Sequence, residues 1–235
     1  MENLRLELIR ITSQAEDIKT FRFRLDKDIP YKAGQYLVLT LDIAGRSVSK
    51  AFSISSSPTE KGYIEFTKKI TDSEFSKTLN DFKVGQNCSL RLPMGKFTFE
   101  GEYEKIAFLS GGIGITPIRS ICKYATDAKL PASLIVLYSS RTPEYLIFKE
   151  DFSIMQKENV NLRVVYTLTH YDEKIAGCRQ GVINEDMVKE EIPDYAQRKF
   201  FICGPPGMVE AMYLMLTDKP QILETNIITE DFVGY

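Results

Sequence analysis

The chain has 235 residues, 43% of them hydrophobic and 26% charged, so it can bury one large core or two modest ones, and we expect two domains. No apolar run approaches the roughly 20 residues that cross a bilayer, and the amino terminus has no signal-peptide core, so we expect a cytoplasmic protein without a membrane span. Four cysteines at spacings typical of no zinc or iron–sulfur site, together with one histidine, argue against the common cysteine- and histidine-based metal sites.

The net charge of −2 is unevenly distributed along the chain. Residues 1–99 hold 16 Lys and Arg against 12 Asp and Glu, whereas the remaining residues hold 14 against 20. A basic front half indicates attraction for phosphates or for an acidic protein partner, but ordinary scatter of solvated charge accounts for it equally well. We expect no nucleic-acid partner.

The segment from residue 4 to residue 99 has the period-2 alternation of β-strands. Residues 4–8, 21–25 and 63–66 alternate apolar and polar side chains, and glycines separate such runs. One helical stretch, residues 73–82, interrupts the pattern. We therefore expect an N-terminal antiparallel six-stranded β-barrel with one short helix over residues 1–100.

From residue 105 the pattern changes to short apolar runs, each followed by a longer amphipathic stretch. The runs are residues 106–109, 134–137, 162–165, 200–203 and 226–229, with a helix expected at 207–216. This alternation is typical of a Rossmann-like parallel α/β sheet. We expect it to form a second domain over residues 101–235, with the boundary near residues 100–104.

The strongest single feature is a glycine-rich loop, residues 109–117, that joins a strand to a helix. Its sequence, Leu-Ser-Gly-Gly-Ile-Gly-Ile-Thr-Pro, lets the backbone approach a ligand closely. Thr116 is expected to cap the helix and Pro117 to occupy its first position, so that the positive end of the helix dipole faces the loop. The loop predicts a pyrophosphate site, although the usual G-x-G-x-x-G pattern fails at Pro117.

A second loop, Cys-Gly-Pro-Pro-Gly-Met at residues 203–208, also follows a strand and precedes a helix. Both loops are expected at the carboxyl edge of one sheet, where open α/β sheets bind ligands. Here the chain resembles the ferredoxin–NADP reductase family, whose nucleotide domain has a GGxGxTP loop followed by a CGPPGM loop. The resemblance implies an FAD-binding barrel joined to an NAD(P)-binding domain, without a fused ferredoxin domain.

On the nucleotide side, the resemblance implies contacts from both loops. These residues are Gly111, Gly112, Gly114, Ile115, Thr116, Gly204 and Met208. After the second strand of this domain, Ser140 and Arg141 offer hydroxyls and a cation to an adenosine 2′-phosphate, and no acidic residue stands there to prefer a free ribose. His170 follows the next strand, where NADPH-using relatives often have arginine, and it is a weaker substitute. The nucleotide is therefore expected to be NADPH or NADH.

On the flavin side, Lys50-Ala51-Phe52-Ser53 stands where the family has its flavin motif, Arg-x-Tyr-Ser. Lys50 keeps a cation for a flavin phosphate but loses the fork of arginine. Phe52 keeps a ring to lie against the flavin but has no hydroxyl for its ribityl chain. The family's second flavin element is implied at residues 66–69 and 75–79, with contacts from Thr67, Lys69, Ser76 and Lys77.

The resemblance also implies a set of residues near the nicotinamide. Ser53 is expected to hydrogen-bond near flavin N5, Cys203 to pack its sulfur against the nicotinamide ring, and Glu230 to anchor the carboxamide or relay protons. Phe232 or Tyr235 is expected to cover the flavin face that receives the hydride. The protein would hold nicotinamide C4 and FAD N5 face to face while the cofactors carry the chemistry.

We therefore expect a flavin-dependent NAD(P)H oxidoreductase that passes electrons between NAD(P)H and a one-electron carrier such as ferredoxin, flavodoxin or another electron-transfer protein. One alternative is a flavin reductase, or an electron-transfer subunit of an oxygenase, hydrogenase or dehydrogenase complex. Another alternative, prompted by the altered Lys50 and Phe52, is a redox-inactive sensor that binds flavin or nucleotide without turnover.

Overall fold

In the computed structural model, which describes residues 2–171, 173–218 and 222–232, the chain divides into two compact units. The first comprises residues 1–100 and 116–124, and the second comprises residues 101–115 and 125–235. Each unit is built on its own six-stranded sheet. Residues 116–124 belong to helix α2 (Ile115–Asp127), so most of this helix is grouped with the first unit, although its sequence follows the first strand of the second.

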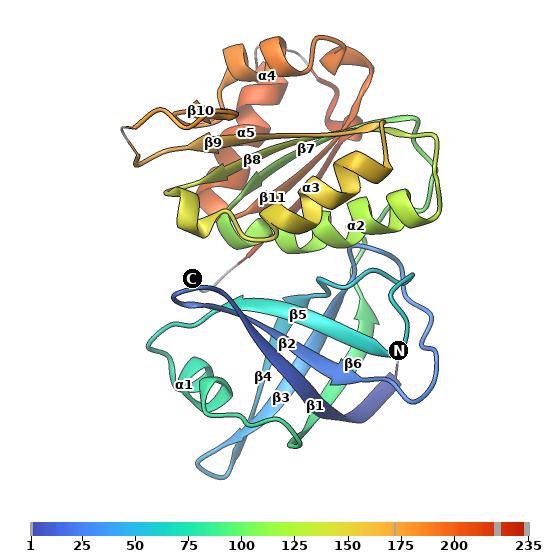
Figure 1. The fold of residues 1–235 in the computed structure, drawn as a ribbon, viewed down its shortest axis with the longest axis vertical. Coiled ribbons are helices and arrows are strands. Elements are labelled where there is room, and N and C mark those ends of the chain that lie inside the picture. Colours follow the sequence, from blue (N-terminus) through green and yellow to red (C-terminus); the bar gives the residue numbers. More distant parts are fainter. Residues whose placement is uncertain (1, 172, 219–221, 233–235) are drawn as a thin grey trace. The chain divides into compact units, whose positions relative to one another are not determined.

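The first unit is an antiparallel barrel, as the period-2 pattern predicts (Figure 1). Its strands follow the order β4-β3-β6-β1-β2-β5, and a bridge between Ile54 and Phe66 joins the two ends of the sheet. The strands are β1 (Glu2–Ala15), β2 (Ile18–Arg24), β3 (Tyr36–Ile43), β4 (Arg46–Ser53), β5 (Tyr63–Lys69) and β6 (Asn87–Met94). The expected helix is α1 (Glu74–Asn80), which Ser73 caps through its side chain.

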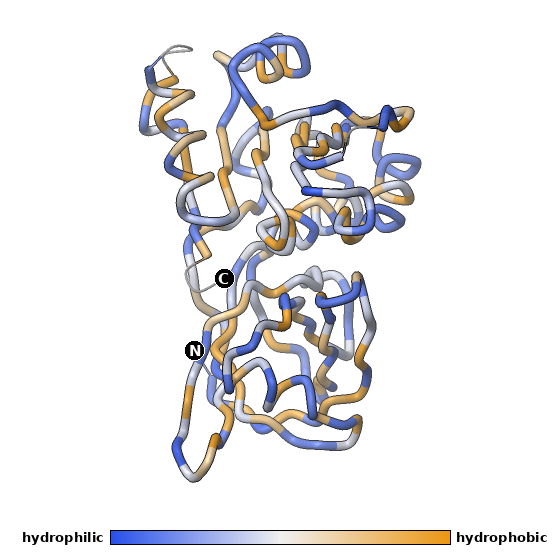
Figure 2. The backbone as a smooth tube through the Cα atoms, turned by 90° about the vertical axis from the view of Figure 1, so that its left-hand side faces the viewer, coloured by the Kyte–Doolittle hydropathy of each residue, from blue (hydrophilic) through white to orange (hydrophobic). Residues whose placement is uncertain are grey.

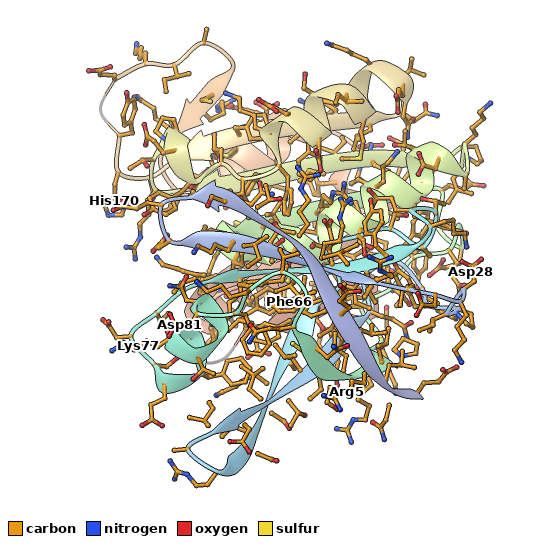
Figure 3. All side chains as sticks on the ribbon, turned by 60° about the horizontal axis from the view of Figure 1, so that its bottom comes forward. Arg5, Asp28, Phe66, Lys77, Asp81 and His170 are labelled. Carbon is orange, nitrogen blue, oxygen red and sulfur yellow. The ribbon has the colours of Figure 1, made fainter. Side chains whose placement is uncertain are left out.

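Alternation along the strands fills the interior of the barrel with apolar side chains. Leu37 and Leu39 of β3 are fully buried, and their neighbours Tyr36, Val38 and Thr40 are more exposed. Figure 2 shows hydrophobic and hydrophilic positions interleaved along this part of the backbone. Phe66 lies inside the barrel, with its ring centroid 4.7 Å from that of Phe52 and 5.3 Å from that of Phe21 (Figure 3). Stacked aromatic rings therefore form the centre of this core.

The second unit contains a parallel sheet with the order β10-β9-β8-β7-β11-β12, which confirms the expected Rossmann-like fold. Its strands are β7 (Lys105–Gly111), β8 (Ser133–Ser140), β9 (Leu162–Leu168), β10 (Cys178–Gln180), β11 (Lys199–Gly204) and β12 (Ile227–Asp231). The remaining helices are α3 (Lys149–Glu158), α4 (Glu185–Glu191) and α5 (Pro206–Asp218). Helices α4 and α5 lie on one face of the sheet and α3 on the other (Figure 1).

Among the residues described, no helix is long and apolar enough to span a membrane. The same part of the chain contains no group of three or more His, Cys, Asp or Glu side chains that could hold a metal ion.

Candidate functional site

The two glycine loops follow neighbouring strands at the centre of the parallel sheet. β7 and β11 pair directly, with Leu109 opposite Ile202 and Ser110 opposite Cys203. From β7 the chain continues to β8 and β9 on one side, whereas β11 leads to β12 on the other. Ligands of open α/β sheets bind at the carboxyl edge where the strand order reverses in this way. The topology therefore brings both loops to the position where a nucleotide is expected.

The loops pack closely at three glycines, and at Gly114 the close neighbours are backbone atoms, which leave no room for a side chain. A Cβ atom on Gly111 would lie 2.2 Å from Met208 Sδ, and one on Gly204 would lie 2.3 Å from Met208 Cε. On Gly114 it would lie 2.3 Å from the carbonyl oxygen of Cys203. Gly112, by contrast, has a φ of +54° and nothing within 4 Å of its Cβ position. The loops are fixed against each other, while the backbone at Gly112 stays open to a ligand.

The helix after the first loop begins earlier than the sequence predicts. A 3-10 turn, η1 (Gly112–Gly114), follows β7 directly and leads into α2 at Ile115. Thr116 is therefore not the N-cap, and Pro117 is not the first helical position; Thr116 is buried inside the helix. Glycines allow a helical turn to start without a side-chain cap, which the Thr-Pro spacing does not reveal. The positive end of the helix dipole consequently lies at the glycines themselves.

Cys203, Glu230 and Phe232 lie together at the ends of β11 and β12. Cys203 is opposite Glu230 in the parallel register, and the Phe232 N–H donates to the carbonyl of Gly204 over 3.0 Å. Burial, followed by the nearby Glu230 carboxylate, raises the pKa of the Cys203 thiol well above its usual value. The thiol is therefore neutral, which suits packing against a ring better than nucleophilic attack. Tyr235, the competing residue for the role of Phe232, lies outside the described residues.

The loops after β8 and β9 hold the residues expected to meet the adenosine end of the nucleotide. The Thr169 N–H donates to the carbonyl of Ser140 over 2.9 Å, and the His170 N–H donates to that of Arg141 over 3.0 Å. Arg141 and His170 are exposed, and Figure 3 marks His170. Ser140 Oγ is buried and has no hydrogen-bond partner in the described parts of the chain. These strand ends therefore offer a hydroxyl and an exposed guanidinium to a ligand.

The predicted flavin motif forms the end of β4. Lys50 and Ala51 are exposed, whereas Phe52 and Ser53 are buried. The Phe52 ring stacks on Phe66, so one of its faces is occupied by the core. Ser53 Oγ is buried, and no described residue gives it a hydrogen bond. A buried hydroxyl without a partner costs free energy unless a ligand supplies one, and the polar edge of a flavin would do so. The residues of this segment therefore fit FAD.

Within the second predicted flavin element, Thr67 and Lys69 are engaged with neighbouring protein groups. Thr67 is buried, and its hydroxyl lies 2.8 Å from that of Thr20 and 3.1 Å from that of Ser55. Lys69 forms an ion pair with Asp17 at 3.2 Å. The barrel therefore already supplies partners for both side chains.

The two residues predicted on α1 differ in exposure. Ser76 is fully buried, and its backbone N–H and hydroxyl both hydrogen-bond the hydroxyl of Ser73. Lys77 is exposed, points away from the barrel in Figure 3, and lies 3.8 Å from Asp72. The structure thus does not gather Thr67, Lys69 and Lys77 into one cluster.

Lys68 is a buried cation that the sequence analysis did not select. Its side chain shares the inward face of β5 with Phe66 and is 6% exposed. Its Nζ lies 5.6 Å from the centroid of the Phe52 ring. Burial and the neighbouring Lys50 lower the pKa of the Lys68 ammonium to about 8. The period-2 pattern, extended from Phe66, was the signal that could have identified this residue.

A buried polar network holds α2 to the segment that follows β4. The Arg119 guanidinium donates to both carboxylate oxygens of Glu60, over 3.1 Å to Oε1, and over 3.0 Å to the carbonyl of Ser55. The Ser120 hydroxyl donates to the carbonyl of Ser56 over 2.6 Å. Although burial opposes ionisation of Glu60, the Arg119 guanidinium holds the pKa of that carboxyl below its usual value. Sequence reasoning missed this pair because its members lie far apart in the chain.

Comparison with known proteins identifies both halves of the chain. Residues 5–99 match the family described as the oxidoreductase FAD-binding domain, and residues 108–213 match the family described as the oxidoreductase NAD-binding domain. The glycine betaine monooxygenase reductase subunit of Pseudomonas aeruginosa is 30% identical over 215 residues, which are 88% of this chain. This chain spans 58% of the length of that relative. NADH-cytochrome b5 reductase 1 of Aspergillus oryzae is 30% identical over 84% of this chain and 72% of its own length.

Solved structures share the fold over nearly the whole chain. A ferredoxin NADP+ reductase from Neisseria gonorrhoeae, solved with bound FAD and NADP, superposes with a TM-score of 0.82 at 19% identity, covering 98% of this chain and 99% of its own. A cytochrome P450 reductase from Amycolatopsis gives a TM-score of 0.86 at 20% identity, covering 98% of this chain and 70% of its own. At this level of identity the likeness concerns the fold.

Proposed function

This chain belongs to the ferredoxin–NADP reductase family, and we propose that it is an FAD-dependent reductase that takes electrons from NADPH or NADH and passes them to a separate one-electron carrier. It carries an FAD-binding domain and an NAD-binding domain. The proposal assigns the flavin to residues 1–100 and the nucleotide to residues 101–235. A cytoplasmic location stays a prediction of the sequence.

The observation that carries the proposal is the pair of interlocked glycine loops where β7 and β11 meet. Gly111 and Gly204 both pack against Met208, and Gly114 packs against Cys203. The loops also place Gly112 and the start of α2 at the carboxyl edge of the sheet. A helix start with open backbone favours the negative charge of a pyrophosphate. This supports nucleotide binding at the loops rather than a purely structural turn.

Bound FAD would accept a hydride from the nicotinamide and release its electrons singly. Ser53 would offer its buried hydroxyl to the flavin, because no described residue uses it. Cys203 would present a neutral, polarizable sulfur to the nicotinamide, while the adjacent Glu230 would orient the carboxamide. Phe232, whose backbone N–H donates a hydrogen bond to Gly204, would cover the flavin face that receives the hydride. Each residue orients a reacting group, and none forms a covalent bond.

Nucleotide choice in this proposal depends on the ends of β8 and β9. Arg141 is exposed and could pair with a 2′-phosphate, and the buried Ser140 hydroxyl lacks a partner among the described residues. His170 stands where NADPH-using relatives often have arginine, and it offers no guanidinium fork, so it adds less. These features favour NADPH, whereas the names of several relatives, such as NADH-cytochrome b5 reductase 1 of Aspergillus oryzae, specify NADH.

The acceptor is proposed to be a separate protein such as ferredoxin, flavodoxin or an oxygenase component. The relative from Pseudomonas aeruginosa is named as the reductase subunit of a monooxygenase, which favours an oxygenase component. Because this chain spans only part of that relative, the acceptor is part of the proposal.

A single preparation of the purified chain tests this function. We expect release of FAD on denaturation, and steady-state reduction of a one-electron acceptor such as ferricyanide by NADPH or NADH. Purified ferredoxin, flavodoxin and free flavin are then tested one at a time as electron acceptors. Reduction of a protein supports a protein acceptor, whereas preferential reduction of free flavin supports a flavin reductase. Flavin that is bound but never turned over with either nucleotide would contradict the proposal and support the sensor.

A further inference from the structure

Helix α2 starts at the first glycine loop and continues into the first compact unit. It follows the turn of Gly112–Gly114, and residues 116–124 are grouped with the barrel. A helix is stiff because its backbone hydrogen bonds run along its whole length. Contacts that hold residues 116–124 therefore also hold the start of α2, where the pyrophosphate is expected.

The barrel segment that contacts α2 begins at the predicted flavin motif. β4 ends at Ser53, and the fully buried Ser55 and Ser56 follow it. The Arg119 guanidinium donates to the carbonyl of Ser55 over 3.0 Å. The Ser120 hydroxyl donates to the carbonyl of Ser56 over 2.6 Å. Helix α2 is thus bound to the backbone just beyond Ser53.

Glu60 fixes the orientation of the Arg119 guanidinium. Its two carboxylate oxygens accept hydrogen bonds from the two terminal nitrogens of Arg119. The same carboxylate accepts from the backbone N–H of Ser57 over 2.7 Å and from the Tyr63 hydroxyl over 2.9 Å. Because this carboxylate is itself held in place, the paired hydrogen bonds keep the guanidinium rigid against the segment after β4.

A buried ion pair is a costly way to hold a helix. Removing two charges from water opposes folding, and apolar side chains of similar volume often stabilise such a position equally well. What a guanidinium and a carboxylate add is a defined geometry, since their two hydrogen bonds are directional. Hydride transfer depends steeply on geometry, because small displacements of the reacting atoms lower its rate.

We propose that Arg119 is a positioning residue for hydride transfer, which fixes the approach of the nicotinamide to the flavin without contacting either of them. The inference rests on the proposed function and deepens it, because Arg119 lies outside both glycine loops and outside the flavin motif. In this step the hydride leaves nicotinamide C4 with the electron pair of its C–H bond and adds to flavin N5, so the nucleotide is oxidised and the flavin is reduced. Arg119 joins the helix that follows Gly114 to the segment that follows Ser53.

The test is anaerobic stopped-flow reduction of the FAD-loaded full chain over a range of nucleotide concentrations. We expect Arg119→Met to lower the rate of flavin reduction at saturating nucleotide about tenfold or more, with unchanged nucleotide affinity and FAD content. The long-wavelength charge-transfer absorbance of the stacked rings should weaken in parallel. Arg119→Lys should recover part of the rate, because it keeps the charge but not the fork. Lys123→Met, which removes the other cation of α2, is the matched control.

The double variant Glu60→Gln/Arg119→Met separates positioning from stability. Replacing both partners leaves no buried charge unpaired, so it should recover much of the stability that Arg119→Met loses, while flavin reduction stays slow. Recovery of the rate together with the stability would overturn the proposal in favour of a structural role, and so would loss of bound FAD.

Two further outcomes decide what fails. If Arg119→Met reduces its flavin as fast as Lys123→Met does, the positioning role is wrong and the proposed function stands. If neither NADPH nor NADH reduces the flavin of the unmodified chain, the proposed function fails and the positioning role fails with it.

Discussion

Cys203 is the residue whose proposed role can be separated most cleanly from stability. It is fully buried at the end of β11, opposite Glu230, and its raised thiol pKa keeps it neutral. A thiol that packs on the nicotinamide would affect reduction of the flavin but not retention of the flavin. An inert buried thiol would affect neither.

We predict that Cys203→Ala slows reduction of the bound flavin by the nucleotide at least several-fold in a stopped-flow experiment, with unchanged FAD content. The half-buried Cys178 of β10 provides the control, since Cys178→Ala removes a thiol from the same unit far along the sheet. Equal rates in both variants would remove Cys203 from the mechanism.

At the residue scale, the sequence predicted which residue types form the motifs better than it predicted which way their side chains face. The family resemblance predicted Thr67 and Lys69 as flavin contacts. The register that pairs Phe21 with Phe66 decides which side chains of β5 face the core, and it places Lys68 on the inward face. Strand register depends on partners distant in sequence, so a local motif does not contain it.

Gly114 joins the two nucleotide loops at the scale of elements. A Cβ atom there would meet the backbone of Cys203, which cannot move without shifting β11. We predict that Gly114→Ala raises the KM for the nucleotide about tenfold or more while FAD stays bound, because the loops could no longer pack.

Gly207 supplies the control for this experiment, since nothing lies within 4 Å of its Cβ position at the start of α5. Gly207→Ala should leave the KM nearly unchanged. Steady-state kinetics measures the KM for the nucleotide in both variants. Equal KM values would show that the contact between the loops does not determine nucleotide binding.

The buried pair of Arg119 and Glu60 anchors α2 to the segment after β4. Their side chains are 9% and 14% exposed, so removing one partner leaves a buried charge. We predict that Arg119→Met lowers the free energy of unfolding by about 3–5 kcal/mol at neutral pH. The double variant Glu60→Gln/Arg119→Met should recover much of this loss. Chemical denaturation measures both, and Lys189→Met, which breaks an exposed pair with Glu185, should change little.

The same pair predicts a pH dependence. Because the pKa of Glu60 is lower in the folded chain than its ordinary value of 4.5, its contribution to stability is fully present above pH 4.5 and is lost as pH falls through the folded value. The stability difference between the unmodified chain and the double variant should therefore shrink on acidification. A difference independent of pH between 3 and 7 would contradict this account.

Most elements could be predicted from the sequence because their periodicity reports which face is buried. The barrel strands β1, β2 and β5, the strands β7, β8, β9, β11 and β12, and helices α1 and α5 coincide with the runs that the patterns identified. The strand β10 and helix α4 were not predicted, and the three residues of β10 are too few for a period to show. The start of α2 was misplaced because capping statistics favour Thr-Pro, whereas here glycines begin the turn.

At the scale of the whole molecule, the residues of helix α2 are divided between the two units. Its first residue follows the glycine turn, and residues 116–124 are grouped with the barrel. A chain with one FAD-binding and one NAD-binding domain has the parts for hydride transfer between two cofactors. Under the proposed function, electrons pass from nucleotide to flavin within this chain.

The most direct measurement is an anaerobic titration of the FAD-loaded chain with NADPH and with NADH, followed by visible absorbance. We predict that at least one nucleotide bleaches the flavin in stoichiometric proportion, and that Arg141→Gln weakens the response to NADPH more than that to NADH. If neither nucleotide bleaches a flavin that dithionite reduces normally, the chain does not carry out the electron transfer inferred here.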